Sequence, residues 1–349
     1  MPLIVAAPEP REPREPQEPR APRAPRTRRA RKWWAFVSVA ALALKFPQLL
    51  KSLKSPLLAL LLALLLVPLL PGCAWLDAQQ RALALRPTPG RPAAFAPASV
   101  AEQENFRPGD LRFTVPVGAH GQQGLALWWL PQADANAPAL LYLHGTLRNL
   151  YGNLPKINAL REAGFAVLAV DYRGWGESTP LVPSEATITA DAARAFAELQ
   201  RRQPHAGRRV IYGHSMGGAV AVRLASTLKG VVNADRTGDY AALVLESTFT
   251  RLPDVAAETG FWGSVAASLT SLEFDSLSRI GSIDAPLWML HGSQDRTVPV
   301  ALGRRLRDAA PAGVQWLEIP GGSHSRLHSD APALYQNTFK QLIASLPAP

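Results

Sequence analysis

A serine, an aspartate and a histidine each stand in a short glycine-containing segment of the sequence. Ser215 is the centre of the pentapeptide Gly-His-Ser-Met-Gly, Asp295 ends the run His-Gly-Ser-Gln-Asp, and His324 follows Gly-Gly-Ser. A serine hydroxyl is a poor nucleophile at neutral pH, so a neutral imidazole must take its proton and a carboxylate must fix the imidazole tautomer. The three residues therefore predict a nucleophilic Ser215, with His324 as its base and Asp295 as the acid.

Other residues compete for two of these roles. Asp284 and Glu246 are alternative acids, and Glu246 directly follows the apolar run 241–245. Asp295 is favoured because it falls in a loop after a predicted strand, which is the usual place for such an acid. His328 is the nearest alternative to His324 as the base.

A possible oxyanion site follows the apolar run 139–143, where the sequence reads His-Gly-Thr. Gly145 permits a tight turn, and the backbone N–H groups of Thr146 and Met216 are predicted to point into the site. Two such donors would stabilise the oxyanion of a tetrahedral intermediate, by typically ~2.7 to 4 kcal/mol each. His144 is interpreted as a structural residue of the turn.

The elements that must position these residues begin at about residue 105. Short apolar runs alternate with longer amphipathic stretches, which is typical of βα units around a parallel sheet. Strands are predicted at 111–116, 124–130, 139–143, 165–170, 209–212, 241–245, 286–290 and 314–319, and helices at 151–163, 184–203, 216–228, 301–309 and 333–346. Ser215 thus falls on a tight turn between a strand and a helix, where flanking glycines leave room for neighbouring backbone.

Several motifs carry a family resemblance. They are His-Gly at 144–145, Asp-Tyr-Arg-Gly-Trp-Gly-Glu-Ser at 171–178, Pro-Ser-Glu at 183–185, Gly-His-Ser-Met-Gly-Gly at 213–218 and His-Gly-Ser-Gln-Asp at 291–295. The run from about 139 to 345 resembles the bacterial α/β-hydrolases of the serine aminopeptidase and monoacylglycerol-lipase type. The resemblance implies an α/β-hydrolase fold with a mostly parallel eight-stranded sheet, a triad in the chain order serine, aspartate, histidine, and no metal or organic cofactor. It also implies hydrolysis of carboxylic esters, thioesters or occasionally amides.

The longest connection between predicted strands covers residues 247–283 and holds several aromatic residues. A lid over the site and an ordinary helix packed on the sheet both fit this segment. No large cap domain fits between residues 245 and 286.

The basic charge is concentrated at the N-terminus. Residues 1–72 hold 12 of the 37 Lys and Arg residues and 4 of the 27 acidic ones, which gives +8 of the net +10. The remainder is nearly neutral and has no stretch that interleaves aromatic with basic residues, so a nucleic-acid partner is not expected. Cys73 is the only cysteine, which excludes an intrachain disulfide and a cysteine-based zinc cluster.

Cys73 also closes a stretch that is typical of a secretory signal. A leucine-rich run at 57–70 follows Lys51 and Lys54 and leads into Leu-Pro-Gly-Cys, which resembles the lipobox of bacterial lipoproteins, where the cysteine is acylated. The apolar core between its flanking prolines is 11 residues, against the ~20 that span a bilayer. A lipoprotein signal is therefore favoured over a single-pass membrane anchor.

These observations divide the chain into four segments. Residues 1–48 are predicted to be a disordered extension, rich in Pro and Arg and then apolar, that could precede the true translation start. Residues 49–72 are predicted to be a lipoprotein signal peptide, residues 73–104 a tether, and residues 105–349 the catalytic domain. The sequence predicts an envelope serine hydrolase, anchored through Cys73 and facing the periplasm, that cleaves a small or lipid acyl ester or thioester. A peptidase of the serine aminopeptidase type and a non-catalytic binding protein on the same fold are the alternatives.

Overall fold

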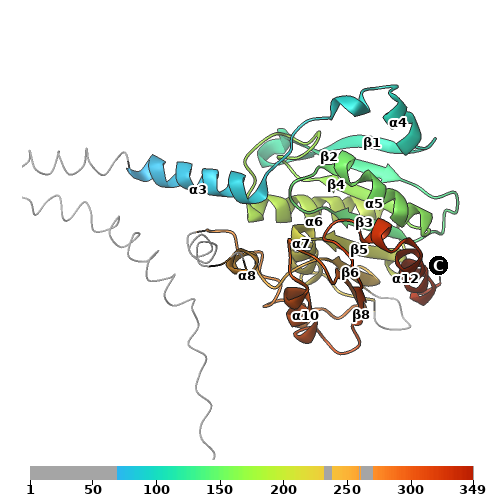
Figure 1. Ribbon diagram of the computed structural model, residues 1–349. Helices are drawn as coiled ribbons and strands as arrows, with labels where there is room; N and C mark the ends of the chain where they lie inside the picture. The colour runs from blue at the N-terminus through green and yellow to red at the C-terminus, as the bar shows by residue number, and fades with distance from the viewer. Residues whose placement is uncertain (1–68, 232–237, 259, 261–269, 349) are drawn as a thin grey trace, which may run out of the picture. The chain divides into compact units, whose positions relative to one another are not determined.

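Eight strands form one sheet in the computed structural model, which describes residues 69–231, 238–258, 260 and 270–348 (Figure 1). The strands are β1 (Leu111–Val117), β2 (Gln123–Leu130), β3 (Ala139–Leu143), β4 (Ala166–Asp171), β5 (Arg209–His214), β6 (Ala242–Glu246), β7 (Leu287–Gly292) and β8 (Gln315–Ile319). Their order in the sheet is β1-β2-β4-β3-β5-β6-β7-β8. β2 runs antiparallel to both of its neighbours and all other pairs are parallel, which confirms the predicted mostly parallel sheet.

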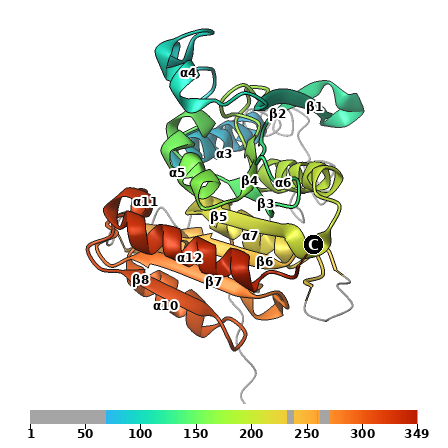
Figure 2. The same cartoon turned by 90° about the vertical axis from the view of Figure 1, so that its right-hand side faces the viewer.

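Helices cover both faces of the sheet (Figure 2). Side chains of α6 (Glu185–Arg202), α7 (Met216–Ala225) and α10 (Val300–Asp308) join one core cluster, and those of α5 (Leu150–Glu162) and α12 (Pro332–Ser345) join the other. Central strands such as β3, β4 and β5 are buried on both faces, so they read as continuous apolar runs in the sequence. This pattern is why the strands lie within two residues of their predicted ends.

The boundaries of α6 follow from local chemistry. The Ser184 hydroxyl accepts from the backbone N–H of Thr187, whose own hydroxyl accepts from the Ser184 N–H, a reciprocal cap that starts the helix. Glu185 lies in the first turn and two arginines lie in the last, so that both ends complement the helix dipole. The helix ends just before Pro204, as the sequence predicts.

The segment before β1, predicted as a tether, contains regular structure and contacts the domain. It contains α3 (Leu69–Leu85) and α4 (Val100–Asn105), and Leu85 is buried in the core. The extended stretch between these helices pairs with the domain, because the Gly176 N–H donates to the Thr88 carbonyl at 2.9 Å. The prolines therefore mark backbone that is held against the domain, and a tethering role stays a prediction.

Several predictions fall wholly or partly outside the described residues. The proposed extension and nearly all of the proposed signal peptide lie in residues 1–68. The chain divides between Pro71 and Gly72, and all eight strands belong to the unit that begins at Gly72. Among the described residues, no helix has the length and apolar character needed to cross a bilayer.

The connection at 247–283 is described in part. It contains α8 (Leu252–Ala257), and Phe249, Leu272 and Phe274 are buried in the same core cluster as α6 and α7. Residues 259 and 261–269 lie outside the description, so the choice between a lid and a packed helix stays open.

Candidate active site

Ser215 lies on a strained turn between β5 and α7. Its φ is 55° and its ψ is −122°, a conformation that L-residues rarely adopt and that costs roughly 1–3 kcal/mol. The turn is fixed by the Ser215 N–H, which donates to the Glu246 carbonyl at 2.9 Å, and by the Thr248 hydroxyl, which donates to the Ser215 carbonyl at 2.9 Å. These two hydrogen bonds therefore hold the strained serine at the carboxyl edge of the sheet.

The glycines of the pentapeptide are required by close backbone contacts. A Cβ atom added to Gly217 would lie 2.0 Å from the Leu143 carbonyl oxygen, and one added to Gly213 would lie 2.2 Å from the Gly217 carbonyl oxygen. No side chain fits at either position without movement of the backbone. The spacing of the motif thus reflects the packing of the turn against β3 and the start of α7.

The structure brings Ser215, Asp295 and His324 together. They follow the carboxyl ends of β5, β7 and β8, as the sequence predicts. His324 Nε2 lies 3.0 Å from Ser215 Oγ, and His324 Nδ1 lies 2.7 Å from Asp295 Oδ2. Both distances lie in the range of hydrogen bonds that transfer or hold a proton.

The carboxylate of Asp295 is buried and well supplied with donors. The backbone N–H groups of Thr297 and Val298 donate to Oδ1 at 2.9 and 2.8 Å, and His291 Nε2 lies 3.4 Å from Oδ2. Burial alone would raise the pKa of Asp295, but hydrogen bonds from His291 and His324 hold this pKa well below its ordinary value. The side chain is therefore an anion at neutral pH.

A second histidine supports the loop that carries His324. The Nε2–H of His214 donates to the His324 carbonyl oxygen at 2.9 Å. Burial, together with the positive charge of Lys156, lowers the pKa of His214 well below its ordinary value, so this imidazole stays neutral. Sequence reasoning missed this role because the partner is a backbone atom more than a hundred residues away.

The three rival residues lie elsewhere. Asp284 precedes β7 at the opposite edge of the sheet, where it accepts from the Gly230 N–H at 2.9 Å. The Glu246 side chain points to the face covered by α5 and α12, and the His328 ring packs against Tyr335. Within the described residues, no hydrogen bond joins these three side chains to Ser215 or His324.

The predicted oxyanion loop passes directly against Ser215. A Cβ atom added to Gly145 would lie 3.0 Å from the Ser215 Cβ atom. In the described part of the chain, no acceptor is paired with the backbone N–H of Thr146 or of Met216, the first residue of α7. Their positions fit the predicted pair of donors, and the role itself stays a prediction.

A buried ion pair lies behind the serine turn. The Lys156 ammonium on α5 contacts the Glu246 carboxylate, which also accepts from the hydroxyls of Tyr212 at 2.6 Å and Tyr335 at 3.0 Å. Glu246 thus joins β6 to β5, α5 and α12 through its side chain and holds Ser215 through its carbonyl. The sequence signal was a lysine inside the apolar face of a predicted helix, which sequence analysis did not single out.

A buried histidine and a buried carboxyl group lie next to each other at the start of the oxyanion loop. His144 Nε2 lies 3.5 Å from Asp171 Oδ1, which accepts from the Leu150 N–H at 2.9 Å. Burial lowers the pKa of His144 to about 4 and raises the pKa of Asp171 to about 8. The pair therefore holds one proton in total over the intervening pH range.

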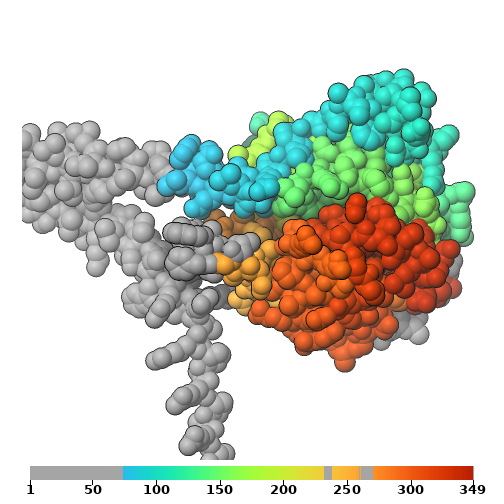
Figure 3. Space-filling model, viewed as in Figure 1, coloured from blue at the N-terminus to red at the C-terminus, as the bar shows by residue number. Residues whose placement is uncertain are grey.

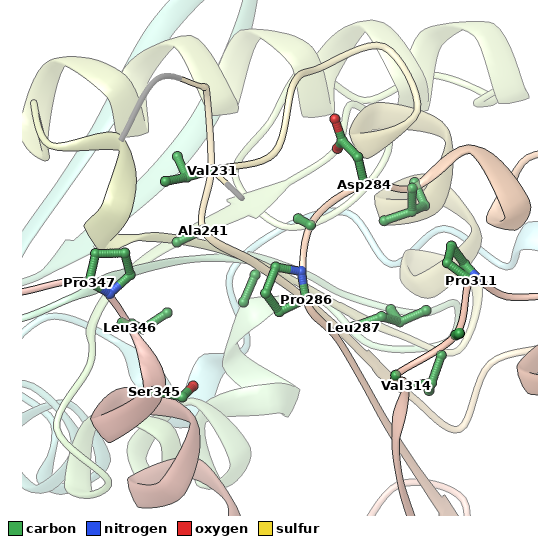
Figure 4. Close-up of a pocket in the computed structure, with 15 residues that line it drawn as sticks. Val231, Ala241, Asp284, Pro286, Leu287, Pro311, Val314, Ser345, Leu346 and Pro347 are labelled. Carbon is green, nitrogen blue, oxygen red and sulfur yellow. The ribbon is translucent and has the colours of Figure 1, made fainter. Parts of the chain in front are cut away.

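An apolar groove of about 490 Å³ lies at the opposite edge of the sheet from Ser215. It is lined by the starts of β6 and β7, by the segment before β8 and by the chain end after α12 (Figure 4). None of the triad residues lines it, so it belongs to a different part of the surface. Among the described residues, no group of three or more His, Cys, Asp or Glu side chains could hold a metal ion.

The fold and this geometry define an α/β-hydrolase. Comparison with solved structures agrees: an esterase from Pyrococcus furiosus superposes with a TM-score of 0.55 at 18% identity, covering 74% of this chain and 97% of that chain. An α/β-hydrolase from Vibrio vulnificus superposes with a TM-score of 0.54 at 18% identity, covering 68% and 82%. At these identities the likeness concerns the fold alone.

Sequence comparison identifies the family. Residues 135–278 match the family described as serine aminopeptidase, S33. An uncharacterized protein of Mycobacterium tuberculosis is 34% identical over 208 residues, covering 58% of this chain and 70% of that protein. The lysophosphatidylserine lipase ABHD12 of Danio rerio is 32% identical over 215 residues, covering 56% of this chain and 54% of the lipase, about half its length. The chain belongs to the serine aminopeptidase family of α/β-hydrolases.

The Lys156–Glu246 pair yields a prediction about stability. Lys156→Met and Glu246→Gln should each lower the free energy of unfolding by about 3–5 kcal/mol, because each leaves one buried charge without its partner. The double variant should lose less than either single variant, since no unpaired charge remains. Urea unfolding of the four proteins measures this difference. Additive losses in the double variant would show that the pair is not coupled.

The His144–Asp171 pair predicts a pH dependence of stability. Between about pH 4 and 6.5 the folded pair and the unfolded residues each bind one proton, so stability is flat. From about pH 6.5 to 8 the folded pair keeps its proton while the unfolded residues have none. Stability should therefore fall by roughly 1.4 kcal/mol per pH unit as the pH rises, or roughly 2 kcal/mol in all. Urea unfolding of wild type and Asp171→Asn tests this: the variant should lose the slope, and equal slopes would contradict the assignment.

Proposed function

We propose that the protein is a serine hydrolase that cleaves a carboxylic ester or thioester through an acyl-Ser215 intermediate. The observation that carries the proposal is the hydrogen-bonded series from Asp295 through His324 to Ser215, at 2.7 and 3.0 Å, on a strained strand-to-helix turn. A complete series of this kind is the arrangement that activates a serine hydroxyl, and it argues against a purely binding role.

The reaction would proceed in two halves. Ser215 Oγ attacks the acyl carbonyl while His324 Nε2 takes its proton, and the N–H groups of Thr146 and Met216 stabilise the oxyanion. The imidazolium then gives the proton to the leaving alcohol or thiol as the acyl–oxygen or acyl–sulfur bond breaks. In the second half, His324 takes a proton from water, the hydroxide oxygen attacks acyl-Ser215, and Ser215 regains its proton as the acid leaves. The Asp295 anion stabilises the imidazolium in both halves.

An acyl lipid or a small acyl ester is the substrate class we favour. The relatives that support it include lysophosphatidylserine lipases, although the chain covers only about half their length. A peptidase or amidase is the second candidate, and the name of the matching family, serine aminopeptidase, favours it. Acyl esters and aminoacyl amides tested side by side distinguish the two bonds.

We also place the protein at the cell envelope, anchored through an acylated Cys73 and facing the periplasm. The support is in the sequence, where a basic flank and a leucine-rich run precede Leu-Pro-Gly-Cys. An anchor of this kind would hold the site close to acyl lipids.

The nucleophile is tested by a fluorophosphonate probe, which labels activated serines. Wild type should be labelled, and Ser215→Ala should lose the label and at least about 10³-fold of its esterase kcat, because the acyl intermediate cannot form. Ser329→Ala is the matched control, since this exposed serine bonds only locally to the Arg326 carbonyl. Equal labelling of wild type and Ser215→Ala, or no labelling of folded wild type, would defeat the proposal.

The anchor is tested with Cys73→Ala in the full chain expressed in a bacterial host. Loss of the acylated cysteine should move the protein out of the membrane fraction, because the acyl chains on this residue are the proposed anchor. Metabolic labelling with a fatty acid should disappear in the same variant. Membrane association at the wild-type level would instead favour a spanning segment.

A further inference from the structure

Five large apolar side chains are exposed around the edge of the sheet that carries the triad. We call them the apolar rim: Trp75 is 61% exposed, Leu76 54%, Leu83 74%, Leu147 48% and Val182 42%. Single exposed apolar residues are ordinary on soluble proteins, but a group gathered at one edge marks an interaction surface.

Two members of the apolar rim belong to loops of the site itself. Leu147 directly follows Thr146 in the predicted oxyanion loop, and its φ of 72° departs from the usual range. Val182 lies in the connection from β4 to α6, which leaves the sheet at the same edge. Both residues are therefore exposed in loops at the edge of the sheet that carries Ser215.

The other three members lie on α3, which is fastened to this edge. Arg81 donates to the carbonyls of Val182 at 3.3 Å and Pro183 at 3.0 Å, and the Ser271 hydroxyl donates to Asp77 at 2.7 Å. In Figure 1, α3 and α8 lie on the same side of the sheet. The helix is thus held to loops at this edge of the sheet.

One face of α3 packs on the domain and another is uncovered. Leu85 is buried in the core, whereas Leu76 and Leu83, seven residues apart and so on one helix face, are exposed. Figure 3 shows the outer side of α3 at the surface. An uncovered apolar face on a fastened helix needs a partner outside the described part of the chain.

The chain itself indicates which partner this is. α3 begins at Leu69, at the end of the leucine-rich run 57–70, and Trp75 follows Cys73 by two residues. In the sequence, Trp75 stands five residues after Leu70, the last residue of that run. A leucine-rich run partitions favourably into lipid, and tryptophan is enriched at the interface between lipid and water. Arg148, beside Leu147, is exposed and makes no ion pair in the described part of the chain, which suits anionic headgroups.

We propose that the apolar rim seats the catalytic edge of the protein on a lipid surface. An acyl ester would then pass from the lipid leaflet to Ser215 without crossing water. This inference rests on the proposed hydrolase function and adds the orientation of the site and the physical state of the substrate.

The test compares one enzyme on two substrates. Full-length protein is reconstituted in vesicles of phosphatidylcholine and phosphatidylglycerol that contain a long-chain monoacylglycerol, and is also assayed on a water-soluble nitrophenyl ester. The triple variant Trp75→Ser, Leu76→Ser, Leu83→Ser should lose about tenfold or more of its turnover in vesicles and keep its turnover of the soluble ester. The soluble ester also reports whether the variant is folded.

The matched control removes exposed apolar residues at the opposite edge. Val100 is 69% and Leu111 49% exposed, Leu111 pairs with Trp129 near the far end of β2, and α4 is joined to β1 by Glu102 and Arg112. Val100→Ser, Leu111→Ser should therefore change neither activity. Equal loss in this control, or wild-type turnover of the vesicle ester by the triple variant, would overturn the inference.

A binding measurement separates this inference from the hydrolase proposal. Brominated phosphatidylcholine in the same vesicles should quench a fluorescence component that is missing in Trp75→Phe. Quenching of the Trp75 fluorescence without turnover of any ester would contradict the hydrolase function but agree with a lipid-facing apolar rim. Turnover of the soluble ester without quenching of Trp75 would contradict the rim alone.

Discussion

The buried negative charge of Asp295 sets the main constraint on this edge of the sheet. A carboxylate without water must be met by donors, and here they are two backbone N–H groups of its own loop and the ring of His324. His291 Nε2, which bonds to the Val298 carbonyl at 2.9 Å, lies 3.4 Å from the same carboxylate. The loop after β7 therefore cannot move far without leaving the charge unpaired. Because His324 is one of the donors, the same requirement fixes the imidazole relative to Ser215.

The position of the serine depends on a second set of contacts from the neighbouring strand. The Glu246 carbonyl at the end of β6 accepts from the Ser215 N–H, while the Glu246 carboxylate is held by Lys156 and two tyrosine hydroxyls on the other face of the sheet. One residue thus connects the strained turn to α5 and α12. Strain of this kind persists only where surrounding contacts fix the backbone, and the contacts of Glu246 fix it here.

Much of this arrangement could be predicted from the sequence because it follows local rules. The strands β3 to β7 are mostly apolar and buried on both faces, and the loops that carry Ser215, Asp295 and His324 come after β5, β7 and β8. The choice of Asp295 over Glu246 was harder, since both follow strands. The deciding fact is the direction of the Glu246 side chain, which alternates along β6 and depends on the register of the whole sheet.

Contacts between distant segments could not be predicted in the same way. The packing of α3, the bond from His214 to the His324 carbonyl and the partner of Lys156 each join segments far apart in the chain, and the residue types involved have many possible partners. The sequence predicted a tether between the proposed anchor and the domain, but a connecting segment can be either free in solvent or paired with another backbone. The pairing with Gly176 required the three-dimensional arrangement of the loop after β4.

Lys156 and His214 interact electrostatically near the serine turn. The Lys156 cation disfavours a second positive charge nearby, and with burial it keeps His214 neutral. A neutral His214 still has one N–H, which donates to the His324 carbonyl, and its other ring nitrogen carries no proton. A charged His214 beside His324 would instead oppose the imidazolium that forms when the base takes the serine proton. Burial, together with the Lys156 charge, therefore leaves no second positive charge on His214 when the His324 imidazolium of the proposed mechanism forms.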